Sequence, residues 1–339
     1  MVTGEPSVVP AVESTAEDIS EMRIRGAATI ADAAAAALAT QADRSAADTP
    51  AAFRRELRTA ARTLYETRPT AVSLPNALRY VLRGVDGDTV AALRTSTIER
   101  AESFQRDLAA AQDTLGEIGA NRLRDGDVVM THCHSTDALS CLEAALESGT
   151  ELEAIVKETR PRKQGHITAR QLREWDVPVT LIADNAARRY LDRADHVLVG
   201  ADSIAADGSV VNKIGTSGLA VNARERGVPV MVAAQTIKLH PDTMTGHTVE
   251  IEMRDERELL SDEERASITG AADADGADGD GPDAVATDDG LRVENPAFDV
   301  TPPRYVDAIV TERGQFPPES IVTLMRELFG ETTDEPWET

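Results

Sequence analysis

Hydrophobic positions along the chain change their spacing near residue 125. Before this point, apolar side chains recur at helical spacing within segments rich in alanine and other good helix formers. These segments predict helices over 27–42, 51–66, 74–84 and 88–119. Ser73 stands before Leu74 and Pro75, which favours a helix N-cap at Ser73 with proline in the first turn. The sequence therefore predicts an N-terminal helical domain over 1–120.

Beyond Asp125, short apolar runs alternate with amphipathic ones. The runs that predict strands are 127–133, 153–158, 178–184, 196–202, 229–234 and 307–312. The segments between them that predict helices are 137–148, 167–175, 185–193 and 216–226. Apolar strands that are each followed by a helix are typical of a parallel sheet covered on both faces. The predicted fold class is α/β, with the helical domain followed by a doubly wound, mainly parallel, Rossmann-like domain over 121–339.

One segment departs from this alternation. Residues 254–290 run into a tract of Gly, Asp and Ala with almost nothing to bury, which predicts a disordered acidic insertion at about 262–290. A repeated Asp-x-Asp-Gly pattern raises calcium binding as an alternative. The twelve-residue spacing and the closing glutamate of a calcium loop are missing, so a solvated surface insertion is favoured.

Composition narrows the function classes. The net charge of −24 and the pI near 4.6 argue against binding to nucleic acid or to a membrane surface, since both need a basic footprint. No run has the length of a transmembrane helix, no signal pattern opens the chain, and two cysteines give no disulfide framework. A carboxylate-rich, lysine-poor surface suits concentrated salt, which screens self-repulsion. The prediction is a cytoplasmic protein of a halophilic cell.

Reactive and anion-binding residues fall at the carboxyl ends of predicted strands, where open parallel sheets bind ligands. Cys133 ends the first strand, directly before a predicted helix start at Ser135, Thr136 and Asp137. The partial positive charge of a helix N-terminus can favour a thiolate, and its free amides suit a phosphate. A buried structural cysteine beside an ordinary N-cap is the commoner alternative when these residues are taken alone.

Two further strands end in candidate site residues. Asp202 could simply cap a turn, but against an apolar wall its pKa would rise and make it a general acid. Asn212 and Lys213 stand before a helix in a segment that suits phosphate without P-loop spacing. Lys238 follows another strand at the same predicted edge. Because the chain has only four lysines, two at this edge suggest a need for a compact ammonium.

Two histidines flank the cysteine and raise the question of a metal. His132 and His134 have no second Cys/His cluster nearby in the sequence, and Cys141 falls inside a predicted helix. Structural roles are therefore favoured over metal ligation.

The helical domain offers two anion-binding candidates. Arg25, Gly26, Ala27 and Ala28 would let a backbone approach an anion beside a guanidinium, and Arg68 lies between two predicted helices. Since surface arginines are ordinary in this composition, solvated side chains are an equal alternative.

Seven segments, in order along the chain, together resemble one known superfamily. They are IRGAATI, TRPTAVSLPNA, THCHST, KETRPRKQG, VGADSIAADGSVVNKIGTSGLA, VPVMVAAQTIK and NPAFDVTPPRYVDAIVTERG. Over about 21–254 and 291–330 the chain is similar to ribose-1,5-bisphosphate isomerases, methylthioribose-1-phosphate isomerases and regulatory subunits of translation initiation factor 2B. The acidic tract 262–290 has no counterpart in the usual pattern.

A few positions separate these branches. The regulatory subunits characteristically lack the Cys and Asp pair, whereas Cys133 and Asp202 are both present. After the cysteine, His134-Ser135-Thr136 is closer to the Asn-Ser of the bisphosphate isomerases than to the Asn-Ala-Gly of the methylthioribose enzymes, although His134 replaces the Asn of both. The resemblance thus implies conversion of ribose 1,5-bisphosphate to ribulose 1,5-bisphosphate in AMP and nucleotide degradation. A methylthioribose-1-phosphate isomerase and a non-catalytic subunit are the alternatives.

The same resemblance implies residue roles and partners. Asp202 would act as the acid on the ring oxygen and Cys133 as the base at C2, with a hydride shift as the alternative route. The implied substrate contacts are Arg25, Gly26, Ala27, Ala28, Arg68, Ser135, Thr136, Asp137, Asn212, Lys213 and Lys238. It implies no metal or organic cofactor, and homo-oligomers that are dimers or hexamers built as trimers of dimers. It leaves a nucleotide activator open.

Overall fold

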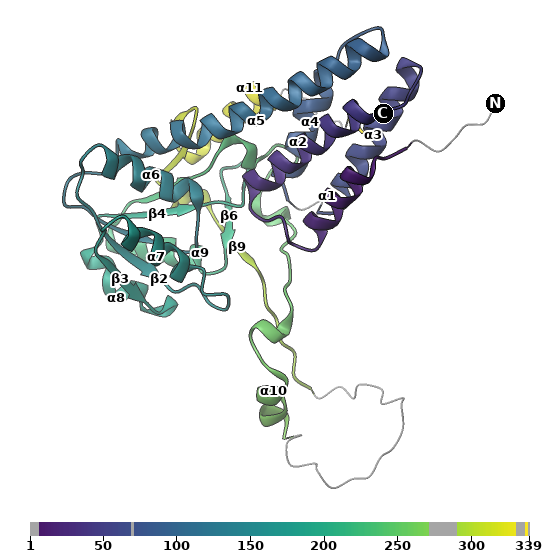
Figure 1. Ribbon diagram of the computed structural model, residues 1–339. Helices are drawn as coiled ribbons and strands as arrows, with labels where there is room; N and C mark the ends of the chain where they lie inside the picture. The colour runs from purple at the N-terminus through teal and green to yellow at the C-terminus, as the bar shows by residue number, and fades with distance from the viewer. Residues whose placement is uncertain (1–6, 69–70, 271–289, 330–335, 338–339) are drawn as a thin grey trace, which may run out of the picture.

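The computed structural model describes residues 7–68, 71–270, 290–329 and 336–337 (Figure 1). Its first part is helical, as predicted: α1 (Pro10–Ser20), α2 (Ala27–Arg44), α3 (Pro50–Tyr65), α4 (Ser73–Arg83) and α5 (Val90–Ala120). The sequence did not predict α1. The N-cap prediction at Ser73 is wrong, because α4 begins one residue earlier than a cap there would allow and its N-cap is Val72.

Helix α5 links the helical part to the sheet. It packs against α2 at one end and against α6 (Thr136–Glu147) at the other. Gly116 and Gly119 make the second contact close, since a Cβ on Gly119 would overlap the Cys141 sulfur. Because α5 belongs to both packing units, the boundary near residue 120 stays a prediction.

A seven-stranded sheet forms the second part, and its strand order is β11-β10-β7-β4-β1-β2-β3. The strands are β1 (Val128–Thr131), β2 (Glu153–Lys157), β3 (Val179–Ile182), β4 (His196–Gly200), β7 (Val230–Ala233), β10 (Ala308–Thr311) and β11 (Gly314–Phe316). All neighbouring pairs are parallel except β10 with β11. Apolar clusters lie on both faces of this sheet, beneath α6, α7 (Gly165–Glu174), α9 (Thr216–Arg226) and α11 (Ile321–Phe329). The predicted fold class is confirmed.

The order of the strands fixes where a ligand would bind. From β1 the chain builds β2 and β3 on one side and then returns to place β4 on the other side of β1. Such a reversal opens a crevice at the carboxyl ends of the two strands that flank it. Here those strands are β1 and β4, and the ends of both carry predicted site residues.

A second, four-stranded sheet was not predicted. Its order is β8-β5-β6-β9, formed by β8 (Leu239–His240), β5 (Ser203–Ala205), β6 (Val210–Lys213) and β9 (Phe298–Thr301). Strand β5 directly follows Asp202, and β6 carries Asn212 and Lys213. This sheet therefore places the end of β4 and the Lys213 segment in one rigid unit.

The first part of the predicted insertion is helical. Residues Asp262–Thr269 form helix α10, so the prediction of disorder from 262 is wrong for these residues. The Ser261 hydroxyl accepts from the Glu264 amide while the Glu264 carboxylate accepts from the Ser261 amide, a reciprocal capping box. Figure 1 shows α10 on an arm that extends away from the sheet and the helices. The remaining part, 271–289, lies outside the described residues. Within the described ranges, no helix is long and apolar enough to cross a membrane.

Candidate active site

The structure brings Cys133 and Asp202 together. Each follows its strand by two residues, and β1 and β4 are paired through Met130 and Val197. The strand ends are tightly packed, because a Cβ on Gly200 would overlap the Ser135 hydroxyl. Asp202 is near enough for its charge to raise the pKa of the Cys133 thiol. The two predicted catalytic residues thus lie at the carboxyl ends of the two strands where the strand order reverses.

The Cys133 thiol is neutral in the resting protein. Burial, with the residue only 8% exposed, and then the Asp202 charge raise its pKa to about 11, while Lys213 and Arg254 oppose the shift. The sequence-based expectation that the helix N-terminus favours a thiolate is therefore wrong for the free protein. Desolvation of the charged form outweighs the partial charge of the first helical turn.

Asp202 is accessible to water, but its surroundings disfavour the charged carboxylate. The residue is exposed, yet the protein around it desolvates the carboxylate and raises its pKa. Lys213, Lys238 and Arg68 pull the pKa back down. An accessible carboxyl that binds its proton more tightly than usual is suited to a general acid, as the sequence predicts. Its catalytic role stays a prediction.

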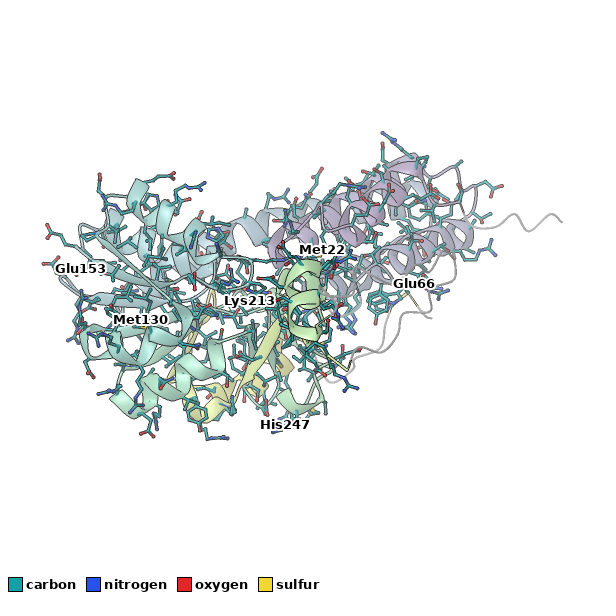
Figure 2. All side chains as sticks on the ribbon, turned by 90° about the horizontal axis from the view of Figure 1, so that it is seen from below. Met22, Glu66, Met130, Glu153, Lys213 and His247 are labelled. Atoms are coloured by element: carbon teal, nitrogen blue, oxygen red, sulfur yellow. The ribbon has the colours of Figure 1, made fainter. Side chains whose placement is uncertain are left out.

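Lys213 faces both reactive groups from β6. Its ammonium is buried, donates to the Ala297 carbonyl at 3.1 Å and lies 4.4 Å from the centre of the Phe298 ring. Burial lowers the pKa of Lys213 below its ordinary value, and the charges of Asp202 and then Cys133 oppose this shift. Figure 2 places Lys213 on the side of the sheet part that faces the helices. The neighbouring Asn212 amide donates to the Thr216 hydroxyl at 3.0 Å.

Lys238 and Asp137 form a buried ion pair of 2.7 Å. The Asp137 carboxylate also accepts from the amide and the side chain of Gln235, so both of its oxygens are used within the protein. The sequence predicted Asp137 as part of a phosphate-binding helix start, whereas in the structure its carboxylate binds Lys238. At the same helix start, Ser135 caps α6 by accepting from the Ala138 amide at 3.3 Å, and Thr136 is exposed.

The helical part supplies its candidates from two places. Arg68 donates to Glu252 at 3.1 Å and lies close enough to Asp202 to lower its pKa. Gly26, with a φ of +89°, is the N-cap of α2, so the amides of the first turn at Ala27 and Ala28 have no side-chain cap. Arg25 is exposed. Helix α2 packs against the 236–238 turn that carries Lys238.

Sequence reasoning missed two charged residues that reach the site from the segment after β8. Glu252 binds Arg68, and Arg254 is close enough to the thiol to lower the pKa of Cys133. Within the described part of the chain, the buried Arg254 Nε has no hydrogen-bond partner. Arg254 lines a recess that also includes Arg160, Arg162 and Lys213. This segment is irregular and shows no hydrophobic periodicity, so its charged residues were the only sequence signal that it contributes to the site.

Both histidines beside the cysteine serve the protein's own hydrogen bonds. His132 is buried, and its Nε2 donates to the Ile214 carbonyl at 2.8 Å while Nδ1 lies 3.2 Å from the Thr159 hydroxyl. Burial is the main cause that lowers the pKa of His132 to about 4, so the ring is neutral at pH 7. His134 contacts the Thr168 hydroxyl at 3.1 Å. Among the described residues no group of three metal-ligating side chains occurs.

Comparison with known proteins places the chain in a family. The family model described as the initiation factor 2 subunit family matches residues 23–318. The chain belongs to the initiation factor 2 subunit family. The superfamily resemblance read from the sequence is therefore confirmed.

Within the initiation factor 2 subunit family, the relatives differ in their names. A ribose 1,5-bisphosphate isomerase from Haloterrigena turkmenica is 80% identical over 333 residues, which cover 98% of each chain. A methylthioribose-1-phosphate isomerase from Koribacter versatilis is 36% identical over 316 residues, which cover 89% of this chain and 84% of the other. The crystal structure of 5-methylthioribose 1-phosphate isomerase from Pyrococcus horikoshii is similar with a TM-score of 0.72 and 31% identity, covering 94% of this chain and 88% of the other.

Proposed function

We propose that this protein converts ribose 1,5-bisphosphate to ribulose 1,5-bisphosphate. The observation that carries the proposal is the coupled pair of Cys133 and Asp202 at the crevice between β1 and β4, with cations on its borders. The 80% identity to a relative named for this reaction supports the choice of substrate, because the methylthioribose-1-phosphate isomerase matches at only 36%.

A phosphate on C1 dictates the chemistry. It locks the sugar in its ring form, so the ring must open without a free aldehyde. Asp202 donates its proton to the ring oxygen as the bond from this oxygen to C1 breaks, and Cys133 removes the C2 proton. The resulting enol phosphate is then protonated at C1 and loses its C2 hydroxyl proton to give the ketone. Each positioned proton transfer contributes about 10²–10⁴-fold to the rate.

This route needs one proton on the pair of Cys133 and Asp202, because the acid must be protonated while the base is not. Because both pKa values are raised and the two charges repel, Cys133 and Asp202 share a single proton between the raised pKa of Asp202 and about pH 11. When that proton is on Asp202, the repulsion that raises the pKa of Cys133 is removed. The reactive form therefore carries the proton on the acid and the charge on the base, and it is a minor form of the resting pair.

Two phosphate groups require cations on more than one side. Lys213 and Arg254 lie on the sheet side, Arg68 reaches in from the helical part, and Lys238 is held by Asp137. In a chain with a net charge of −24, this concentration of cations around two acidic groups supports an anionic substrate. The free amides of Ala27 and Ala28 at the start of α2, with Arg25 beside them, are assigned to one of the phosphates.

The setting of the reaction is part of the same proposal. The protein acts in AMP and nucleotide degradation in the cytoplasm of a halophilic cell, as a homo-oligomer that is a dimer or a hexamer of three dimers. A nucleotide activator would bind outside the Cys133–Asp202 crevice. The name of the Haloterrigena turkmenica relative supports the small sugar-phosphate substrate.

The direct test of the function is a comparison of substrates. Purified protein in high salt is supplied with ribose 1,5-bisphosphate, ribose 1-phosphate or methylthioribose 1-phosphate, and ketose formation is followed. We expect kcat/KM to be highest for the bisphosphate by about tenfold or more, since one charge-assisted contact is worth about 1.5–3 kcal/mol. Equal values for the bisphosphate and methylthioribose 1-phosphate would refute the assignment, and no ketose from any substrate would favour a non-catalytic subunit.

A charge-neutral double variant tests the role of Lys238. Lys238→Met alone would strand the buried Asp137 carboxylate, so it is combined with Asp137→Asn. We expect the double variant to weaken ribose 1,5-bisphosphate by about ten- to a hundredfold in KM, and ribose 1-phosphate far less. Lys163→Met, at an exposed lysine, is the matched control and should behave as wild type. An equal rise in KM for both substrates would show that Lys238 does not bind the second phosphate.

A further inference from the structure

Two residues at adjacent strand ends have an unusual backbone conformation. Cys133 has a φ of +71° after β1, and Thr159 has a φ of +63° after β2. Side chains with a Cβ rarely adopt this left-handed region, and a β-branched residue such as threonine does so least of all. Such conformations are unfavourable and persist only where the surroundings hold them. The hydrogen bonds that hold them identify which residues fix the reactive thiol.

One hydroxyl joins the two strained residues. The Cys133 amide donates to the Thr159 Oγ1 at 2.9 Å, and the Thr159 side chain is fully buried. A hydroxyl has a single proton to donate. Because His132 donates through Nε2 to the Ile214 carbonyl, its Nδ1 is free to accept that proton at 3.2 Å, with the Lys157 carbonyl at 3.1 Å as the other acceptor. The Thr159 hydroxyl therefore accepts from the Cys133 amide and donates its proton to His132 Nδ1 or to the Lys157 carbonyl.

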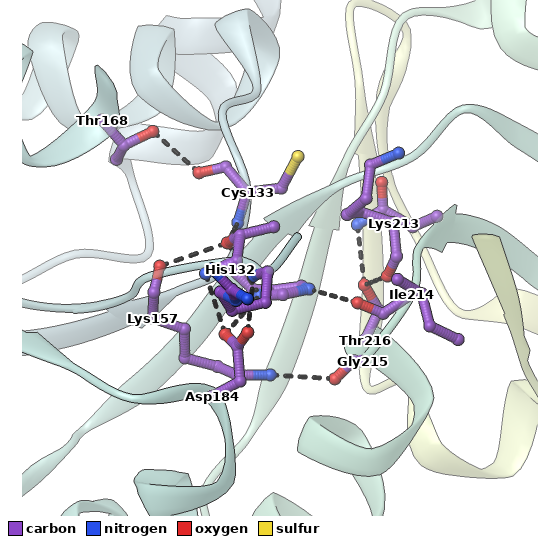
Figure 3. A network of polar contacts seen from close by, with 12 residues as sticks. His132, Cys133, Lys157, Thr168, Asp184, Lys213, Ile214, Gly215 and Thr216 are labelled. Atoms are coloured by element: carbon purple, nitrogen blue, oxygen red, sulfur yellow. Dashed lines mark hydrogen bonds and ion pairs between the residues drawn. The ribbon is translucent and has the colours of Figure 1, made fainter. Parts of the chain in front are cut away.

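The next strand in turn holds Thr159. The Asp184 carboxylate, just after β3, accepts from the Thr159 amide at 2.9 Å and from the Arg160 amide at 2.7 Å. Two-point binding of this kind fixes the peptide plane between the two amides. A continuous series of hydrogen bonds thus runs from the end of β3 through the end of β2 to the end of β1. Figure 3 labels Asp184 and Cys133 at its two ends.

The far side of the cysteine is fixed as well. The Thr168 hydroxyl of α7 donates to the Cys133 carbonyl at 2.8 Å, so both peptide groups of Cys133 are bonded to buried threonines. His132, one residue earlier, binds the residue that follows Lys213. In Figure 3 the Cys133 sulfur and the Lys213 side chain extend toward the same side of this network. The network therefore sets the thiol in a fixed place relative to Lys213.

We propose that Thr159 is a positioning residue for the reaction: its hydroxyl, held by Asp184, keeps Cys133 in the left-handed conformation that directs its sulfur to the C2 hydrogen of the substrate. This inference rests on the proposed role of Cys133 as the base. It assigns Thr159 no contact with the substrate. A displacement of the base by about 1 Å lowers a rate by about a hundredfold, so the hydroxyl acts through geometry.

The test compares three threonine variants by kinetics. Thr159→Val keeps shape but removes the hydroxyl, Thr159→Ser keeps the hydroxyl, and Thr97→Val removes an equally buried hydroxyl from α5 as the matched control. We expect Thr159→Val to lower kcat by about ten- to a hundredfold with KM within about threefold. Thr159→Ser should recover most of that loss, and Thr97→Val should keep wild-type kcat. Folded Thr159→Val with wild-type kcat would overturn the proposal.

A second readout needs no substrate. Alkylation of Cys133 by iodoacetamide is followed by peptide mass spectrometry, which separates it from Cys141. Release of the backbone should expose the buried thiol and accelerate its alkylation in Thr159→Val by about fivefold or more, with no change in Thr97→Val. If Cys133→Ala stayed active, the proposed base would be wrong while this readout still reported on positioning. If Thr159→Val fails to fold, Asp184→Asn replaces it, because asparagine keeps one acceptor oxygen. We expect Asp184→Asn to lower kcat and to accelerate the alkylation of Cys133, both more weakly than Thr159→Val. Wild-type behaviour of Asp184→Asn would overturn the proposal.

Discussion

Cys133→Ala should abolish the formation of ribulose 1,5-bisphosphate, with kcat lower by about 10²–10⁴-fold or more. Alanine has no group that removes the C2 proton, and no other side chain at the end of β1 replaces it. The melting temperature should change little, because alanine fits the same space and has the same backbone preference as cysteine. The measurement is ketose formation at saturating substrate beside a thermal unfolding scan.

A matched cysteine separates chemistry from packing in this experiment. Cys141→Ala removes a thiol that is fully buried between α5 and α6, next to Gly119. We expect it to keep wild-type kcat even if it unfolds at a lower temperature. Near-normal turnover in Cys133→Ala would remove Cys133 from the mechanism.

Asp202→Asn should give a folded protein that binds substrate and does not turn it over. The amide preserves shape and polarity but has no proton to release and recapture, so ring opening loses its acid and kcat falls by about 10²–10⁴-fold. Calorimetric titration with ribose 1,5-bisphosphate should show affinity that is equal or improved, since a negative charge beside the phosphates has been removed. Loss of binding together with activity would mean that Asp202 binds substrate or supports structure.

The same substitution has a second expected effect, on the thiol. The Asp202 charge is the second cause, after burial, that raises the pKa of Cys133 to about 11. In Asp202→Asn the alkylation midpoint of Cys133 should therefore move to lower pH, although burial keeps it above the ordinary value for a thiol. An unchanged midpoint would show that the two groups are not coupled.

The dependence of the rate on pH follows from the same pair. Below the raised pKa of Asp202 both groups are protonated and the base is lost, so kcat/KM should fall as pH falls through that value. Near pH 11 the pair loses its remaining proton and with it the acid, so kcat/KM should fall again. The profile should be a broad plateau between these limits. A steep rise through pH 8–9 would indicate an ordinary thiol that titrates alone.

The sequence predicted six of the seven strands of the main sheet, the helices α6, α7 and α9, and the meeting of Cys133 with Asp202, but it did not predict β11 or α11. Each predicted element is a continuous run with its own periodicity, and parallel strands place their carboxyl ends at one edge whatever their order. The second sheet was missed because β5 and β8 are only three and two residues long and because its strands pair across distant parts of the chain, as β6 does with β9. Short segments carry too little pattern to be recognised alone.

The polar details of the site were also beyond the sequence. Spacing gave no sign that Asp137 would bind Lys238, or that Thr159 would bind the amide of Cys133, because these bonds join residues far apart in the chain. The thiol was expected to ionise at a helix start, but burial depends on packing that no local pattern reveals. By contrast, the helix over Asp262–Thr269 had a readable Ser-x-x-Glu capping signal, which the acidic composition of the tract obscured.

The fate of the C2 hydrogen tests most directly whether Cys133 and Asp202 catalyse proton transfer. Ribose 1,5-bisphosphate labelled with deuterium at C2 is converted by the wild-type protein in ordinary water, and the early product is examined by mass spectrometry and NMR. If Cys133 removes the hydrogen, label is lost to water and C1 of ribulose 1,5-bisphosphate gains solvent hydrogen; unlabelled substrate in heavy water gains deuterium at C1. Quantitative transfer of the C2 deuterium to C1, with no solvent hydrogen at that carbon, would contradict the proton-transfer mechanism and establish a hydride shift.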